Sequence, residues 1–140
     1  MIILDTNVLS EPLRVMPDPA VRAWFDAQAL ENLYICTPVL AEMRFGIDRL
    51  AIGAKQQRLK EAADQLEYQR YRGRVLPFDA TAALIYGRIV AARERSGRPL
   101  GVLDGMIAAI AIQHNVVATR DTRDFALPDL TVVDPFGFGK

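Results

Sequence analysis

Four acidic residues have a type and a placement that could support chemistry: Asp5, Glu42, Asp104 and Asp121. The first and last each follow a short apolar run, whereas the middle two sit among apolar residues at helical spacing. A carboxylate in such surroundings is costly unless it is hydrogen-bonded, paired with a cation or bound to a metal. If the four acids converge, their like charges raise one another's pKa, and a divalent cation relieves that repulsion.

The ligand types in this set predict Mg²⁺, with Mn²⁺ as a substitute, because both cations prefer oxygen ligands. Zinc is not expected, since the chain has a single cysteine, Cys36, and a single histidine, His114. A divalent cation held by carboxylates beside an open face activates water and stabilises charge on phosphoryl oxygens. The four acids are therefore predicted to be both metal ligands and catalytic residues for phosphodiester hydrolysis.

The segments that must position these acids alternate between strand and helix patterns. Ile2–Leu4 has no polar alternation, which is typical of a strand buried on both faces. Asp18 and Thr37 are each followed by proline, and Asp79 stands before a helical pattern, so we interpret all three as N-caps. We expect strands at 2–4, 33–36, 74–78, 116–118 and 130–133, and helices at 19 to about 30, 38 to Gly53, 54–69, 80–95 and 102–114.

Strands that alternate with helices indicate right-handed βαβ units, and hence an α/β three-layer domain with a parallel sheet. Residues 1–140 are expected to form one domain, because nothing in the sequence resembles a linker or an internal repeat. Ligands bind at the carboxyl ends of the strands in open parallel sheets. Asp5 would stand at that edge, and Asp121 beside it if strands one and four are neighbours. The alternative for Asp5 is the N-cap of the following helix.

Four further polar residues are candidates for supporting the acids. Thr6, Asn7 and Thr119 are placed to hydrogen-bond carboxylates or metal-bound water, although helix caps and turns explain them equally well. Asp124 is interpreted first as a residue that caps or turns its loop. If a helical turn begins at Asp121, these two acids at i and i+3 share a face, and Asp124 then supports Asp121 through a water.

The composition is that of an ordinary globular protein, with 51% hydrophobic residues, 24% charged residues and a formal net charge of zero. Without a basic excess, any contact with nucleic acid must come from local patches or a metal. The chain begins in a core strand and has no apolar run of membrane-spanning length, so we expect neither a signal peptide nor contact with a membrane. A buried, unpaired Cys36 fits a cytoplasmic location.

Four segments, taken together over nearly the whole chain, resemble PIN-domain proteins. The resemblance is nearest to the VapC-family toxins of type II toxin–antitoxin modules, in the FitB-like branch. The segments are Ile-Leu-Asp-Thr-Asn-Val-Leu-Ser-Glu-Pro at 3–12, Val-Leu-Ala-Glu-Met-Arg-Phe-Gly at 39–46, Leu-Asp-Gly-Met-Ile-Ala-Ala at 103–109, and Ala-Thr-Arg-Asp-Thr-Arg-Asp-Phe at 118–125.

The resemblance implies a five-stranded parallel sheet in the order 3-2-1-4-5 and a Mg²⁺- or Mn²⁺-dependent endoribonuclease. It also implies a homodimer and a small VapB- or FitA-like antitoxin, which usually supplies DNA binding and often blocks the acidic pocket with its C-terminal segment. The matching acids are Asp5, Glu42, Asp104 and Asp121. Many members of the family have asparagine in place of Asp121 and an acid in place of Asp124, so either residue can be the fourth acid. We expect Asp121.

Two other functions remain open on the sequence alone. The chain could act mainly as the non-catalytic partner of a DNA-binding antitoxin in an autoregulatory repressor, although such a role needs no cluster of carboxylates. It could also be a phosphatase or a DNA nuclease, since metal–carboxylate hydrolysis is not specific for RNA. Seven arginines between residues 70 and 98 are expected to be mostly solvated, with some guiding RNA phosphates: Arg70, Arg72, Arg74, Arg88, Arg93, Arg95 and Arg98.

Overall fold

The computed structural model describes residues 1–140 and places five strands in one parallel sheet: β1 (Ile2–Leu4), β2 (Leu33–Cys36), β3 (Val75–Leu76), β4 (Val116–Ala118) and β5 (Thr131–Val133). Their order is β3-β2-β1-β4-β5. Ile3 in the central strand pairs with Tyr34 of β2 on one side and Val117 of β4 on the other. The expected α/β class, the strand order and the adjacency of strands one and four are confirmed.

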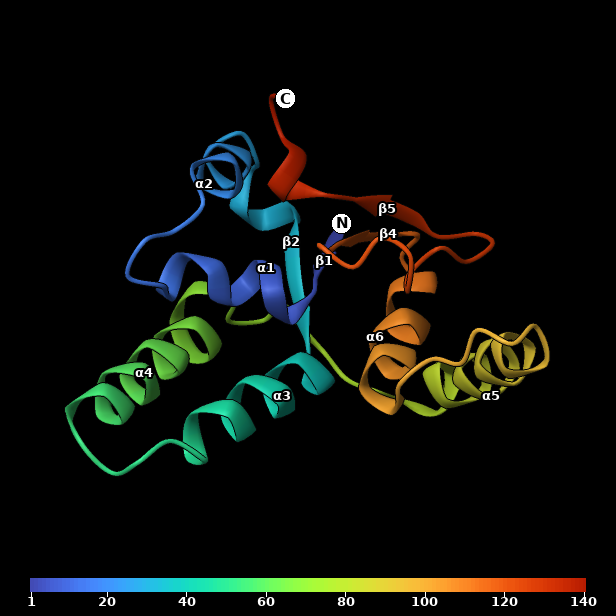
Figure 1. Cartoon of the computed structure of the whole chain (residues 1–140), viewed down its shortest axis with the longest axis horizontal. Coiled ribbons are helices and arrows are strands. Elements are labelled where there is room, and N and C mark those ends of the chain that lie inside the picture. The colour runs from blue at the N-terminus through green and yellow to red at the C-terminus, as the bar shows by residue number, and fades with distance from the viewer.

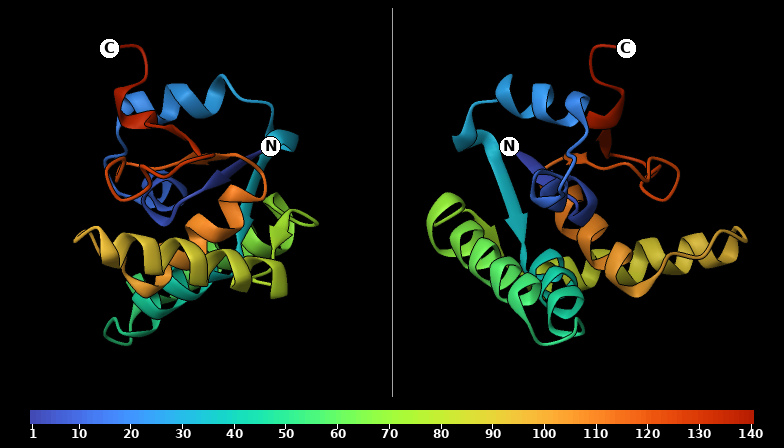
Figure 2. Two further views of the ribbon diagram at one scale, coloured as in Figure 1. Left: turned by 90° about the vertical axis from the view of Figure 1, so that its right-hand side faces the viewer. Right: turned by 60° about the vertical axis from the view of Figure 1, so that its left-hand side comes forward.

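Helices lie in the connections between the strands, except in the one between β4 and β5 (Figure 1): α1 (Thr6–Ser10), α2 (Pro19–Asp26), α3 (Thr37–Asp48), α4 (Ala54–Gln65), α5 (Ala80–Arg95) and α6 (Val102–Ile112). Shorter helical turns are η1 (Glu11–Leu13), η2 (Leu30–Asn32), the π-helical η3 (Leu66–Arg70) and η4 (Pro135–Gly137). In the views of Figures 1 and 2, α2 and η4 lie above the strands, and α3 to α6 lie below them. Helix α5 packs against α6 and stands out at the side of the molecule.

The core is built where the apolar strands meet α3 and α6. The side chains of Ile3, Leu4, Ile35 and Val117 are completely buried, as expected for strands covered on both faces. Helix α6 is buried without a break from residue 107 to 111 and packs against α3, α5 and β4, which anchors it firmly in the core. This packing fixes the edge of the sheet at which the acids lie.

Both boundaries of α3 differ from the expected ones. Helix α3 ends at Asp48, and Gly53 is the N-cap of α4 instead of the stop of α3. Thr37 is the first residue of α3, and Cys36 holds the N-cap position. The Oγ1 atom of Thr37 instead accepts a hydrogen bond from the backbone N–H of Phe78 at 3.1 Å, which ties α3 to the chain beyond β3. The hydroxyl therefore serves tertiary structure more than its own helix.

Further differences concern short segments. Residues 6–10 form a helix directly after β1, which was not among the expected helices. Strand β3 is only two residues long and ends before Pro77, which suits its place at the edge of the sheet. Leu30 belongs to η2 and not to α2, which ends at Asp26. None of the helices combines the length and the apolarity that a membrane crossing requires.

Candidate active site

Asp5 stands at the carboxyl end of the central strand, between β1 and α1. Its backbone N–H donates to the carbonyl oxygen of Ala118 at 2.9 Å, which continues the pairing of β1 with β4 as far as this residue. Its Oδ1 atom accepts from the backbone N–H of Thr6 at 2.8 Å, so Asp5 caps α1. The capping role and a place at the sheet edge thus belong to one carboxyl group, whose residue is only 3% exposed.

Two polar side chains connect Asp5 to Asp121 across the ends of β1 and β4. Thr119 Oγ1 donates to Asp5 Oδ2 at 2.7 Å and accepts from the backbone N–H of Asp121 at 2.9 Å. The amide nitrogen of Asn7 donates to Asp5 Oδ2 at 3.2 Å and to Asp121 Oδ2 at 3.1 Å. The Oδ1 atom of Asn7 accepts from the backbone N–H of Arg120 at 3.1 Å. The start of α1 and the loop after β4 are thereby fixed around one pair of carboxylates.

Glu42 approaches from α3, in the second turn of that helix, and is half-buried. It lines a groove together with Thr6. The Oγ1 atom of Thr6 is the only buried side-chain nitrogen or oxygen in the protein that has no hydrogen-bond partner. Thr6 therefore contributes its backbone to Asp5, while its hydroxyl is unused beside Glu42.

Asp104 lies in the first turn of α6, and the following residue explains how it is positioned. A Cβ atom on Gly105 would lie 2.8 Å from the ring of Tyr86 and 2.9 Å from the side chain of Val90. Glycine is therefore needed for α6 to approach α5 this closely. The close contact holds the start of α6, and with it Asp104, against α5.

The acids influence one another electrostatically. Burial raises the pKa of Asp104 to about 6, and the negative charges of Asp5 and Asp124 add to that effect, followed by those of the other two acids. Burial also raises the pKa of Asp5, with further contributions from Glu42 and Asp121 that oppose its hydrogen bonds from Thr119 and Thr6. Carboxyl groups with raised pKa values, close to other acids, favour a cation as their partner.

The loop after β4 brings both Asp121 and Asp124 toward the other acids. The backbone N–H of Asp124 donates to the carbonyl oxygen of Asp121 at 3.1 Å, which forms a turn, and Phe125 is completely buried. Asp121 is linked to Asp5 through Asn7, whereas Asp124 contributes more than Asp121 to the raised pKa of Asp104. Asp121 therefore has a hydrogen-bonded link to Asp5, whereas Asp124 acts on Asp104 through its charge.

Arg93 secures this loop, although it was expected to belong to a solvated surface. Its residue is only 7% exposed. Its Nη1 atom donates to the carbonyl oxygen of Asp124 at 2.8 Å, and its Nε atom donates to that of Arg98 at 2.8 Å. The backbone of Asp124 is held in this way, and not by its carboxylate. The signal in the sequence was that Arg93 continues the helical spacing of the buried Ala82 and Ile89.

The donor set suits a hard divalent cation. None of the four expected acids forms an ion pair with lysine or arginine, so none of them has its charge balanced by the protein. No group of three or more acidic, histidine or cysteine side chains is already arranged as a metal cage. Mg²⁺ keeps several of its waters and takes only one or two carboxylates directly, and carboxylate oxygens are ligands of the type that it prefers.

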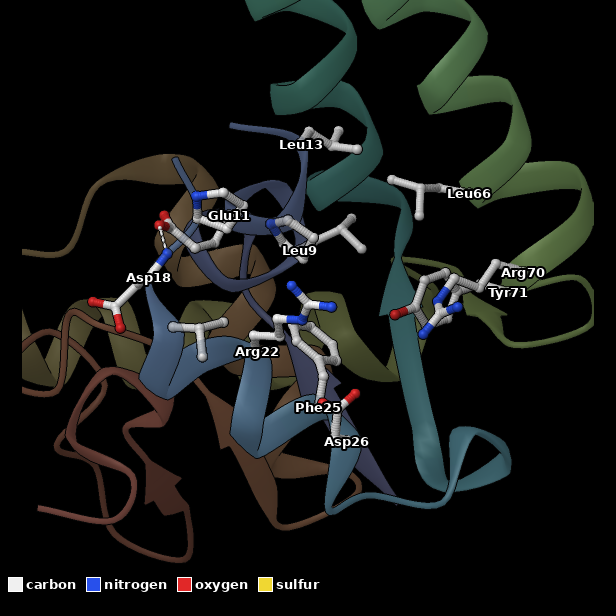
Figure 3. Close-up of a pocket in the computed structure, with 13 residues that line it drawn as sticks. Leu9, Glu11, Leu13, Asp18, Arg22, Phe25, Asp26, Leu66, Arg70 and Tyr71 are labelled. Carbon is white, nitrogen blue, oxygen red and sulfur yellow. Dashed lines mark hydrogen bonds between the residues drawn. The ribbon is translucent and has the colours of Figure 1, made fainter. Parts of the chain in front are cut away.

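A separate cavity of about 360 Å³ lies between η1, α2 and η3, and none of the four acids lines it (Figure 3). Its wall includes the buried Glu11, whose Oε1 atom accepts from the backbone N–H of Asp18 at 2.9 Å. Glu11 was not singled out from the sequence as a candidate functional residue. Its role is to close the segment between η1 and α2.

Comparisons with known proteins agree with this geometry. A model of the PIN domain matches residues 2–129. Toxin FitB of Neisseria gonorrhoeae is 43% identical over 97% of this chain and 99% of its own length. VapC ribonuclease Y4jK of Sinorhizobium fredii is 41% identical over 97% of this chain and 98% of its own length. The solved structure of FitAB bound to an IR36 DNA fragment contains a chain with 42% identity and a TM-score of 0.91, covering 100% of this chain and 99% of that one.

Proposed function

We propose a function for this chain on the basis of its family: it belongs to the PIN-domain family, in the branch of the VapC- and FitB-type toxins. It is the toxin of a type II toxin–antitoxin module and an endoribonuclease, and it acts in the cytoplasm. The observation that supports this function most strongly is the set of unpaired acids at the carboxyl edge of the sheet, where the pKa of Asp104 is raised to about 6.

Asp5, Glu42, Asp104 and Asp121 would hold a Mg²⁺ or Mn²⁺ ion. When bound, that cation would supply an activated water and offset the charge that develops on the phosphoryl oxygens. Thr119 and Asn7 fix the orientation of the Asp5 carboxylate, so its oxygens need no reorganisation when the substrate arrives. Asp124 lies close enough to influence Asp104 and is the alternative fourth acid.

The partners follow from the same family. The relative in the FitAB structure is found together with FitA on DNA, and the S. fredii relative is named a ribonuclease. We therefore assign to this chain an RNA substrate and a small DNA-binding antitoxin as its inhibitor. The protein is proposed to work as a homodimer of one-domain protomers.

RNA cleavage by the purified chain, free of any antitoxin, tests this function. Single-stranded RNA should be cut in the presence of Mg²⁺ or Mn²⁺, and EDTA should stop the reaction. Single-stranded DNA of the same sequence serves as the matched control and should remain intact. Undiminished RNA cleavage in EDTA would exclude a metal-dependent mechanism. Cleavage of the DNA but not of the RNA would exclude the ribonuclease function.

A further inference from the structure

A groove of about 660 Å³ is continuous with the candidate active site, because Glu42 and Thr6 are among the residues that line it. Its walls come from α1 and the segment after η1 on one side, and from α3 and α4 on the other. These elements lie next to one another in the fold (Figure 1). A ligand in the groove would therefore lie beside the acids and not at a remote surface.

The charge of this groove is opposite to that of the active site. Three cations line it, Arg14, Lys55 and Arg58, and Glu42 is its only acid. Lys55 and Arg58 form no ion pair, and Arg14 has only a long contact of 3.4 Å with Glu11 while its side chain stays 63% exposed. A local excess of this kind is notable in a chain whose formal net charge is zero. It provides the local basic patch that contact with phosphates requires.

The groove also offers apolar surface at two depths. Met43 and Ile47 of α3 are each 6% exposed, so the wall that they form is part of the core. Val15 and Met16 also line the groove and are 91% and 85% exposed. Apolar side chains beside free cations suit unpaired nucleotides, whose bases pack against apolar groups while their phosphates contact the cations.

We infer that single-stranded RNA flanking the scissile bond lies in this groove, with its phosphates on Arg14, Lys55 and Arg58 and a base against Met16. This inference rests on the proposed ribonuclease function and adds the path of the substrate to it. The observations that favour RNA over an apolar protein segment are the three cations and the continuity with the acids. The arginines on α5 are then dispensable for binding.

Two charge-matched triple variants test this path. One replaces Arg14, Lys55 and Arg58 by glutamine, and the control replaces Arg72, Arg88 and Arg95, which are exposed and form no ion pair. With a long single-stranded RNA, the groove variant should raise KM roughly tenfold or more and lower the slope of log KM against log salt by about 2, since each lost phosphate contact removes about 0.7. The control variant should leave both quantities unchanged.

A dinucleotide substrate distinguishes the loss of RNA binding in the groove from damage to the active site. It reaches only the acids, so its cleavage by the groove variant should match the wild type. If the groove variant keeps the wild-type KM and salt slope on long RNA, or if the control variant changes them as much, the inference is overturned. Wild-type protein that cleaves no RNA in Mg²⁺ would instead overturn the proposed ribonuclease function.

Discussion

Thr119 Oγ1 lies 2.7 Å from Asp5 Oδ2, and this buried hydrogen bond joins residues 114 positions apart at the ends of two neighbouring strands. Thr119 is completely buried and also accepts the backbone N–H of Asp121 at 2.9 Å. One hydroxyl therefore sets both the orientation of the central carboxylate and the start of the loop that carries Asp121.

Thr119→Val should test this role, because valine keeps the shape of threonine but cannot donate to Asp5. The pKa of Asp5 should rise further, since the Thr119 hydrogen bond lowers it. We expect RNA cleavage to fall about tenfold, which corresponds to about 1.4 kcal/mol in the barrier. Thr122→Val, at an exposed position in the same loop, is the matched control. Equal rates for the two variants would show that the hydroxyl does not position Asp5.

The raised pKa of Asp104 predicts how the stability of the metal-free protein depends on pH. Its folded-state pKa is about 6, against an ordinary value of 3.8, so the folded state binds the proton more tightly than the unfolded state. The resulting stabilisation is complete below the ordinary value and is lost as the pH rises through about 6.

Asp104→Asn removes this titration, so in EDTA it should raise the melting temperature relative to wild type at neutral pH more than at acidic pH. Asp26→Asn, at an exposed position on α2, should show no such dependence. A shift for Asp104→Asn that is the same at both pH values would contradict the electrostatic account.

Asp121 and Asp124 should differ in their effect on cleavage. The carboxylate of Asp121 is linked through Asn7 to Asp5, whereas the loop is held through the backbone of Asp124. Asp121→Ala should therefore weaken Mg²⁺-dependent cleavage more than Asp124→Ala, and both variants should remain folded in thermal melts. A near-normal Asp121→Ala protein beside an inactive, folded Asp124→Ala protein would make Asp124 the fourth acid.

Much of this arrangement is predictable from the sequence because it depends on local patterns. The unbroken apolar run before Asp5 identifies a central strand, and the strand–helix alternation identifies a parallel sheet whose carboxyl edge collects the acids. The position of Arg93 was not predicted, because charge normally indicates exposure and its partners are backbone carbonyls from distant segments. The burial of Glu11 was missed for the same reason, since its partner is the backbone of Asp18. Sequence patterns report apolar faces well, but not polar groups that are satisfied by tertiary contacts.

The cognate antitoxin should inhibit by placing a cation among the acids. Asp5, Glu42 and Asp104 have no arginine or lysine partner within this chain, and a guanidinium binds carboxylates as a bidentate fork. Replacing the arginines and lysines in the C-terminal segment of the antitoxin by glutamine, one at a time, should identify one that abolishes inhibition without releasing the toxin. A complex that leaves these carboxylates open and catalysis intact would contradict this prediction.

The acids should act together as a metal-dependent site, and a Mg²⁺ titration of RNA cleavage shows whether they do. Wild type, Asp5→Asn and Asp104→Asn should be compared in one assay, with thermal melts to establish that each variant is folded. We predict that each variant is slower by about 10²-fold or more, because a Lewis-acid metal contributes several kcal/mol and each 1.36 kcal/mol is about tenfold. Folded Asp5→Asn and Asp104→Asn proteins that cleave RNA at the wild-type rate, with the same dependence on Mg²⁺, would show that these carboxylates do not hold the metal.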